Sequence, residues 1–231
     1  MHRLGVLGLH PALTMRIPLT AFLLLASCAS ERPPAKIETP EGVIFARNDE
    51  VARTCLGYLR EYQPQVSAIF DTNPERPVIE VRPWLVGVTL GNEIVVAELE
   101  GWNRYLVHEL SHLHAKEHWS TLPDGIEEPL CELIALAIAE GYETVKVDAP
   151  TREQVELLLV VDQARWQRNI AELLAAGYWT VGQVGFERLR SLAKRADSTG
   201  RARIPPEWIL ECLPEVWEPV TIDLKTLVAF D

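Results

Sequence analysis

The chain has 231 residues, of which 48% are hydrophobic and 24% charged, and its mean hydropathy is near zero. This balance is typical of a folded soluble domain, and it excludes both general disorder and a multispanning membrane protein. The formal net charge of −11 results from 33 acids against 22 bases. It argues against nucleic-acid binding and against attraction to anionic lipid through charge.

The first thirty residues predict a secretory signal. Arg16 precedes an apolar run over residues 19–25 that is too short to span a bilayer permanently. Residues 25–28, Leu-Ala-Ser-Cys, resemble the bacterial lipobox. This resemblance implies removal of residues 1–27 and lipidation of Cys28 as the mature N-terminus. An ordinary signal peptide with an incidental cysteine is the alternative interpretation.

The lipobox resemblance also implies a location. The protein is expected in the bacterial cell envelope, held to a membrane through the lipid on Cys28 and facing the periplasm. Residues 28–45 are expected to form a tether, with one domain over residues 46–231.

If Cys28 is lipidated, three other cysteines remain, namely Cys55, Cys131 and Cys212. At most one disulfide can then form, and the sequence does not indicate which two of them would pair.

The predicted elements of the domain begin with an amphipathic helix over residues 46–70, where apolar residues recur at helical spacing. Prolines and an Asn-Pro pair end it. Residues 77–82 alternate like a strand, and residues 92–97 predict a second strand after a Gly-Asn turn. A further helix is expected to begin near Gly101.

That helix carries His108-Glu109-x-x-His112, the H-E-x-x-H pattern. A spacing of four residues brings both imidazoles to one face of a helix, where they can bind one zinc ion. Glu109 is turned about 100° from His108, so it can stand beside the metal without binding it. There it can take a proton from zinc-bound water and pass it to a leaving amine.

One candidate for a third ligand is His118. The run H-E-x-x-H-x-x-A-x-x-H resembles the metzincin motif, but Ala115 stands where metzincins have a turn-forming glycine. A continuing helix instead carries His118 about 9 Å beyond His112. Metzincins also need a downstream methionine turn, and the only methionines are Met1 and Met15. The sequence therefore disfavours His118.

The other candidate lies in residues 122–133, Leu-Pro-Asp-Gly-Ile-Glu-Glu-Pro-Leu-Cys-Glu-Leu. This segment resembles the glutamate helix of gluzincins, the thermolysin-like zinc peptidases, in which a glutamate completes a His-His-Glu zinc site. The resemblance runs from about residue 46 to residue 141. Pro129 replaces the usual glycine and Gly125 the usual tryptophan. Pro129 is acceptable if it lies in a first helical turn.

The gluzincin resemblance also implies which glutamate binds the metal. In that family an acid four residues after the ligand commonly orients a ligand histidine. Glu128 has Glu132 at this spacing, whereas Glu127 has Cys131. Glu128 is therefore expected to be the ligand and Glu132 its support. Adjacent helical residues diverge by about 100°, so Glu127 and Glu128 are not expected to face the histidines together.

Four further residues are weaker candidates. His114 is expected to point away from the paired histidines, as a solvated or packing residue. Cys131 either approaches the site or is a small buried core residue. Tyr142 and Tyr178 are the kind of donor that can stabilise an oxyanion, but no spacing selects either of them over a role in packing.

The remainder of the chain predicts mainly helices. Residues 151–154, Thr-Arg-Glu-Gln, form a capping box before an apolar pattern that ends at Gly177. Two more helices are expected over residues 186–194 and 205–213. By resemblance to gluzincins, residues 146–231 form a helical C-terminal part that supplies one wall of the cleft.

The sequence thus predicts an α+β fold, with a small mixed sheet packed on the H-E-x-x-H helix and a glutamate helix. The resemblance implies a zinc-dependent hydrolase, a peptidase with a peptide or protein substrate, and the acidic net charge predicts no nucleic-acid partner. A catalytically inactive lipoprotein that serves as a binding or assembly module is the alternative. Retention of Glu109 favours the enzyme, because a scaffold has no chemical need for that acid.

Overall fold

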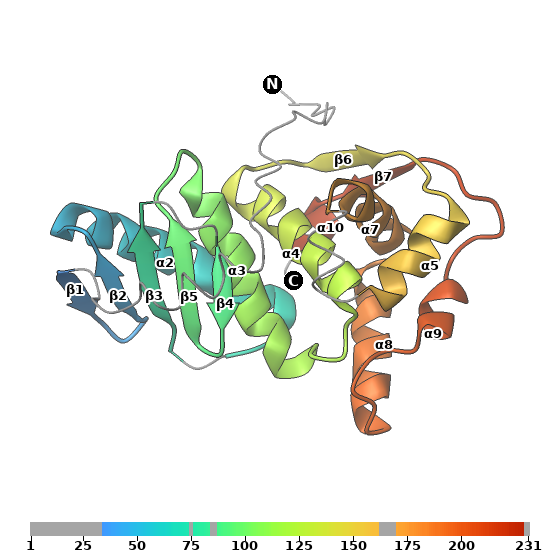
Figure 1. The fold of residues 1–231 in the computed structure, drawn as a ribbon, viewed down its shortest axis with the longest axis horizontal. Coiled ribbons are helices and arrows are strands. Elements are labelled where there is room, and N and C mark those ends of the chain that lie inside the picture. Colours follow the sequence, from blue (N-terminus) through green and yellow to red (C-terminus); the bar gives the residue numbers. More distant parts are fainter. Residues whose placement is uncertain (1–33, 74–75, 84–86, 162–169, 229–231) are drawn as a thin grey trace.

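The computed structural model describes residues 34–73, 76–83, 87–161 and 170–228 (Figure 1). It confirms the predicted α+β class, because a five-stranded mixed sheet with packed helices precedes a mostly helical C-terminal part. The expected signal peptide and Cys28 lie outside the described residues. Among the described helices, none has both the length and the apolar character needed to cross a bilayer.

The sheet has the strand order β1-β2-β3-β5-β4. Its three central strands run parallel, and the edge strands β1 and β4 are antiparallel to their neighbours. Ile44, Ile79 and Ile94 stand beside one another in the register and are fully buried. They form the face on which the helices pack. The strands are β1 (Ala35–Glu38), β2 (Val43–Ala46), β3 (Val78–Arg82), β4 (Val88–Leu90) and β5 (Glu93–Ala97).

The first two strands correct the expected tether. Residues 35–45 were assigned to it, but β1 and β2 occupy this stretch, and Ile44 and Phe45 are buried. Each strand has only four residues, so its local pattern is weak. Strand β1 pairs with β2, and β2 pairs with β3, which lies more than thirty residues later in the chain. The folded domain therefore includes Ala35.

Helix α2 (Asp49–Phe70) confirms the first predicted helix. The side chain of Asn48 accepts a hydrogen bond from the backbone N–H of Val51, and Asp71 ends the helix with a φ of 54°. Its apolar face packs on β1 and β2. The buried residues of this face include Val51, Cys55, Leu59, Tyr62, Val66 and Ile69.

Helix α3 (Trp102–His118) lies between the sheet and helix α4 (Asp124–Ala139). A short connection joins the two helices, and Trp119 and Leu122 within it are buried. Because the connection is short, the two helices pack closely along their lengths (Figure 1). This packing brings the glutamates of α4 to the histidines of α3.

The C-terminal part contains a two-stranded antiparallel ribbon as well as helices. The capping box is confirmed, since Thr151 and Gln154 exchange hydrogen bonds of 3.2 and 2.8 Å. The elements are β6 (Thr144–Val147), α5 (Arg152–Val160), α7 (Ile170–Val184), α8 (Phe186–Ser198), α9 (Pro206–Leu210), β7 (Val220–Asp223) and α10 (Lys225–Val228).

Gly177 does not end a helix, which corrects the expected boundary. Helix α5 ends at Val160, and α7 continues through Gly177 to Val184. A Cβ atom on Gly177 would lie 2.2 Å from Cγ of Pro129 and 3.0 Å from the carbonyl oxygen of Gly125. The glycine is thus explained by a close crossing of α7 over α4 rather than by a helix end.

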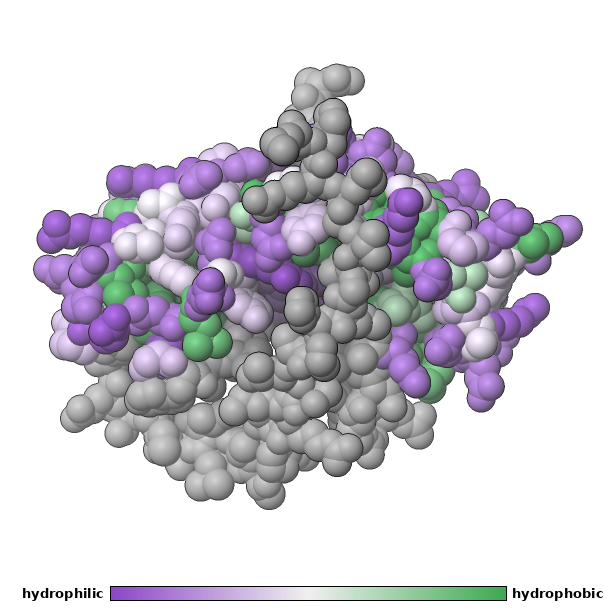
Figure 2. All heavy atoms as spheres, turned by 90° about the horizontal axis from the view of Figure 1, so that it is seen from above, coloured by the Kyte–Doolittle hydropathy of each residue, from purple (hydrophilic) through white to green (hydrophobic). Residues whose placement is uncertain are grey.

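One face of the described surface is mainly polar. On the face shown in Figure 2, hydrophilic residues cover most of the described area, and hydrophobic residues lie between them in smaller groups. This distribution agrees with the acidic composition. The exposed large hydrophobic residues are Leu90, Leu99, Tyr105, Leu157, Val160 and Val216.

Candidate metal centre

The two motif histidines lie side by side on α3. Nε2 of His108 is 3.1 Å from Nε2 of His112. Glu128 reaches them from α4, and its Oε2 atom lies 3.5 Å from Nε2 of His108 and 3.6 Å from Nε2 of His112. All three side chains are partly buried. The structure thus brings the three predicted ligands together.

These separations suit a common metal ion. Ligand atoms placed tetrahedrally at about 2.0–2.1 Å from a zinc ion lie about 3.3 Å apart. The three observed distances, 3.1, 3.5 and 3.6 Å, are close to that value. His108, His112 and Glu128 could therefore hold a metal ion without a rearrangement of the helices.

A carboxylate holds the outer nitrogen of each histidine. Oε2 of Glu132 lies 3.1 Å from Nδ1 of His108, and Oε1 of Glu127 lies 2.7 Å from Nδ1 of His112. When each Nδ1–H donates to its carboxylate, the lone pair of each Nε2 is directed into the ligand group. The two contacts thus fix both rings in an orientation that binds metal.

The contact of Glu127 corrects one expectation. Glu127 and Glu128 were not expected to face the histidines together, yet both contact His112. The two nitrogens of an imidazole lie on different edges of the ring. Two side chains about 100° apart on α4 can therefore reach different edges of the same histidine. The angle of about 100° between neighbouring helical residues therefore does not prevent Glu127 and Glu128 from contacting the same histidine.

Arg104 also contacts the carboxylates around the histidines, although it belongs to no part of the H-E-x-x-H motif. Its guanidinium forms ion pairs with Glu132 and, at 3.1 Å, with Glu140. Glu132 thus lies between Arg104 and His108. Arg104 precedes His108 by four residues, so the two share one face of α3. That spacing was the signal that could have identified it.

Cys131 both approaches the site and is fully buried. Its sulfur lies 3.7 Å from Nδ1 of His112. Burial raises the pKa of the thiol to about 11, so it is neutral near pH 7. Cys131, Glu127 and His112 form a second group of possible ligand atoms, which shares His112 with the first.

The charges within the centre favour a cation. Burial disfavours the ionised form of Glu128, but hydrogen bonds with His108 and His112 lower its pKa well below the usual range. Burial also disfavours protonation of His112, but its hydrogen bonds to the carboxylates of Glu127 and Glu128 favour the protonated form and raise its pKa well above the ordinary value. Without a metal, an ionised carboxylate thus faces a protonated imidazole.

Pro129 lies farther into α4 than the sequence suggested. It was expected in a first helical turn, but α4 begins at Asp124, which places Pro129 in the second turn. Its ring occupies the position where the N–H partner of the Gly125 carbonyl would lie. Gly177 of α7 approaches both residues, so the interrupted turn faces the α4–α7 crossing.

Glu109 turns toward the edge strand of the sheet. Its side chain is 6% exposed, and Oε2 accepts a hydrogen bond of 2.6 Å from Oγ1 of Thr89 on β4. A Cβ atom on Gly87 would lie 2.4 Å from Oε1 of Glu109. Thr89 of β4 therefore holds the carboxylate, and Gly87, the residue before β4, leaves room for it. Neither residue belongs to a recognisable motif in the sequence.

His114 lies on the opposite side of α3 and is fully buried. Its Nδ1 atom is 2.6 Å from Oγ1 of Thr72, and burial lowers its pKa to about 4. His114 therefore points away from the paired histidines, as expected, and of the two expected roles, solvated or packing, it has the packing one.

Helix α3 continues through His118, as expected for a continuing helix. The side chain of His118 lies outside the described part of the structure.

The remaining candidates belong to the core. Tyr178 is buried, and burial raises the pKa of its hydroxyl. Tyr142 is partly buried and packs against the core. Within the described residues, Cys55, Cys131 and Cys212 form no disulfide bond.

Comparison of the chain with protein-family models, with curated proteins and with solved structures gives no match. The interpretation of the centre therefore depends on its own residues and geometry.

Proposed function

We propose that the protein is a zinc-dependent hydrolase that cleaves amide bonds in peptides or proteins. The observation that carries this proposal is the group of three ligand atoms at 3.1–3.6 Å, with both outer histidine nitrogens held by carboxylates. Two imidazoles and one carboxylate are a ligand set of catalytic zinc sites. Such a set leaves a fourth position for water or substrate.

The chemistry assigned to the chain rests on Glu109. Zinc, when bound, supplies a Lewis acid that lowers the pKa of water and polarises a carbonyl. Glu109 follows His108 directly and is held by Thr89 at 2.6 Å. In the proposal its carboxylate takes the proton from the attacking water and delivers it to the leaving amine.

The edge strand supports an extended peptide as substrate. Among the described residues, β4 is the last strand of the sheet and pairs with β5 on one side. An edge strand offers backbone donors and acceptors to a peptide that pairs with it. Because Thr89 of β4 contacts Glu109, a peptide paired with this edge would lie near the proposed base.

One observation favours a second function, a catalytically inactive binding module. Both carboxylate oxygens of Glu109 are engaged at the start of β4, because Oε2 is bonded to Thr89 and Oε1 lies close to Gly87, the residue before the strand. A glutamate that only joins α3 to β4 would have a structural role. In that case the metal group would stabilise the fold or a partner interface.

Metal analysis and one substitution separate the two functions. The purified domain should contain about one zinc per chain after exposure to zinc. Wild type should cleave unstructured peptides, and Glu109→Gln should lose this activity while keeping its zinc. Equal absence of activity in both proteins, with zinc retained, would favour the binding module. Absence of zinc from the wild type would contradict both.

We also propose that the lipobox anchors the domain to a membrane of the bacterial envelope, facing the periplasm. The cysteine and the first strand are close in sequence, since β1 begins at Ala35 and Cys28 lies seven residues earlier. Expression in a bacterium should give a membrane-associated protein whose N-terminal peptide has a lipid-modified mass. Cys28→Ala should release it, and an unmodified cysteine in the wild type would contradict the proposal.

A further inference from the structure

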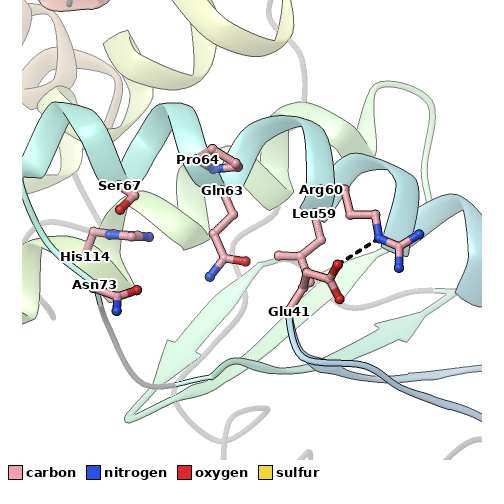
Figure 3. A pocket seen from close by; sticks show the side chains of 8 residues that line it. All are labelled: Glu41, Leu59, Arg60, Gln63, Pro64, Ser67, Asn73 and His114. Atoms are coloured by element: carbon pink, nitrogen blue, oxygen red, sulfur yellow. Dashed lines mark hydrogen bonds and ion pairs between the residues drawn. The ribbon is translucent and has the colours of Figure 1, made fainter.

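A cavity of about 340 Å³ lies between α2, the segment that follows α2, the turn before β2 and α3 (Figure 3). His114 contributes to its wall from α3. Positions 112 and 114 of a helix are turned about 200° from one another. The cavity therefore lies on the side of α3 opposite the metal centre, and it belongs to no part of the proposed hydrolase site.

His114 has one satisfied and one unsatisfied nitrogen. Nδ1 lies 2.6 Å from Oγ1 of Thr72, whereas Nε2 is buried and has no hydrogen-bond partner among the described residues. The residue is 0% exposed. Native proteins rarely leave a buried polar atom without a partner, because its lost hydration is then uncompensated. His114 is among the residues that line the cavity, so a ligand bound there can become the partner of Nε2 if the surrounding side chains move to uncover that atom.

The size of the cavity indicates a molecule larger than one water. A water molecule occupies about 30 Å³ in the liquid, roughly a tenth of this cavity. Pockets that bind small molecules begin at about 300 Å³. The volume therefore fits a ligand of about monosaccharide size.

The lining favours hydroxyl groups. The side-chain amides of Gln63 and Asn73 form no hydrogen bond with the described part of the chain, and both line the cavity. Ser67 already donates its hydroxyl proton to the carbonyl oxygen of Thr72, so its oxygen remains an acceptor. A hydroxyl group can both donate and accept, and it suits His114 Nε2 in either tautomer.

The charged residues of the lining are already paired. Nε of Arg60 donates to Oε1 of Glu41 at 3.1 Å (Figure 3). Oε2 of Glu41 is buried without a partner among the described residues, so it could accept from a hydroxyl only if a neighbouring side chain moved to uncover it. Leu59 and Pro64 supply an apolar surface between these polar groups. A ligand with hydroxyl groups, a C–H face and no net charge satisfies this combination.

We propose that this cavity binds one uncharged, polyhydroxylated molecule of monosaccharide size, with His114 Nε2 as its central polar contact. Such a site is independent of the metal centre. It would give the domain a second binding function, for a neutral sugar or polyol.

The test measures binding of four neutral sugars, namely glucose, galactose, mannose and N-acetylglucosamine. Each is added to the folded domain at up to about 10 mM, where a ligand with a Kd of about 1 mM is largely bound. At least one should transfer saturation in NMR difference spectra and shift the Nε2 resonance of His114. Glucosamine and glucuronate, which carry charge, should bind at least about tenfold more weakly.

Substitutions locate the site. His114→Gln should weaken binding about tenfold or more, in line with the loss of one hydrogen bond. Gln63→Leu lies on the partly exposed face of α2, so it tests the cavity if the buried histidine proves necessary for folding. Gln65→Leu is its matched control, because Gln65 is exposed on the same helix and bonds to the carbonyl of Glu61.

The proposal is overturned if no neutral sugar binds, or if the charged sugars bind equally well. It is also overturned if Gln63→Leu and Gln65→Leu have the same effect. Removal of zinc by a chelator should leave sugar binding unchanged, whereas loss of binding on chelation would place the ligand at the metal centre instead.

Discussion

Nδ1 of His112 lies 2.7 Å from Oε1 of Glu127, the residue directly before the proposed ligand Glu128. Helix α4 therefore contacts one imidazole on both of its nitrogens. Four residues after Glu128, Glu132 contacts the other histidine at 3.1 Å. One helix thus supplies three carboxylates to two rings, and its position against α3 determines the geometry of the centre.

The first prediction concerns the metal ligands. Glu128→Ala should reduce zinc affinity most, because it removes a ligand atom. Glu127→Ala and Glu132→Ala should each reduce it about 10–100-fold, because each releases the outer nitrogen of a ligand histidine. His118→Ala should have little effect. Competition with a chromophoric chelator measures this order, and a largest loss for His118→Ala would exclude the gluzincin interpretation.

The second prediction concerns protons. The pKa of His112 in the metal-free protein is raised, so this imidazole is protonated near pH 7 and must lose its proton to bind metal. Zinc affinity should therefore increase with pH up to that pKa and level off above it. Calorimetry in two buffers of different ionisation enthalpy should detect about one released proton. Equal heats in both buffers would contradict the raised pKa.

The third prediction concerns the proposed base. Gly87→Ala would place a methyl group 2.4 Å from Oε1 of Glu109, so the carboxylate must move. We expect at least about a tenfold loss of kcat with zinc content unchanged, because the ligands are untouched. Gly57→Ala is the control, since nothing lies within 4 Å of its added Cβ. Full activity of Gly87→Ala would contradict the proposal that the Glu109 carboxylate, in the position seen here, is the general base.

The fourth prediction concerns the crossing of α7 over α4. Gly177→Ala would place its Cβ 2.2 Å from Cγ of Pro129, and a backbone oxygen lies behind it at 3.0 Å. Overpacking of this kind lowers the free energy of unfolding by about 1–3 kcal/mol. Denaturant unfolding measures the change, and Gly57→Ala should be neutral or slightly stabilising. An unchanged midpoint for Gly177→Ala would show that the helices separate easily.

The sequence by itself determined the features that depend on local geometry. The spacing of His108 and His112 placed both imidazoles on one face because the helix repeats every 3.6 residues. The capping box at Thr151 and the apolar face of α2 were predicted for the same reason, since each depends only on residues within a few turns. The choice of Glu128 and Glu132, in contrast, came from the resemblance to gluzincins, in which an acid commonly follows the ligand glutamate by four residues.

Tertiary structure decided which groups meet across elements. Strands β1 and β2 are too short to be recognised from their own pattern, and they exist because β3 supplies hydrogen-bond partners to β2 from a distant part of the chain and β2 pairs in turn with β1. The contact of Glu127 with His112 depends on how α4 lies against α3, which helical angle does not specify. The cavity beside His114 depends on α2, α3 and the turn before β2 together. Local spacing determines the face on which a side chain lies, whereas its partner is determined by packing between elements.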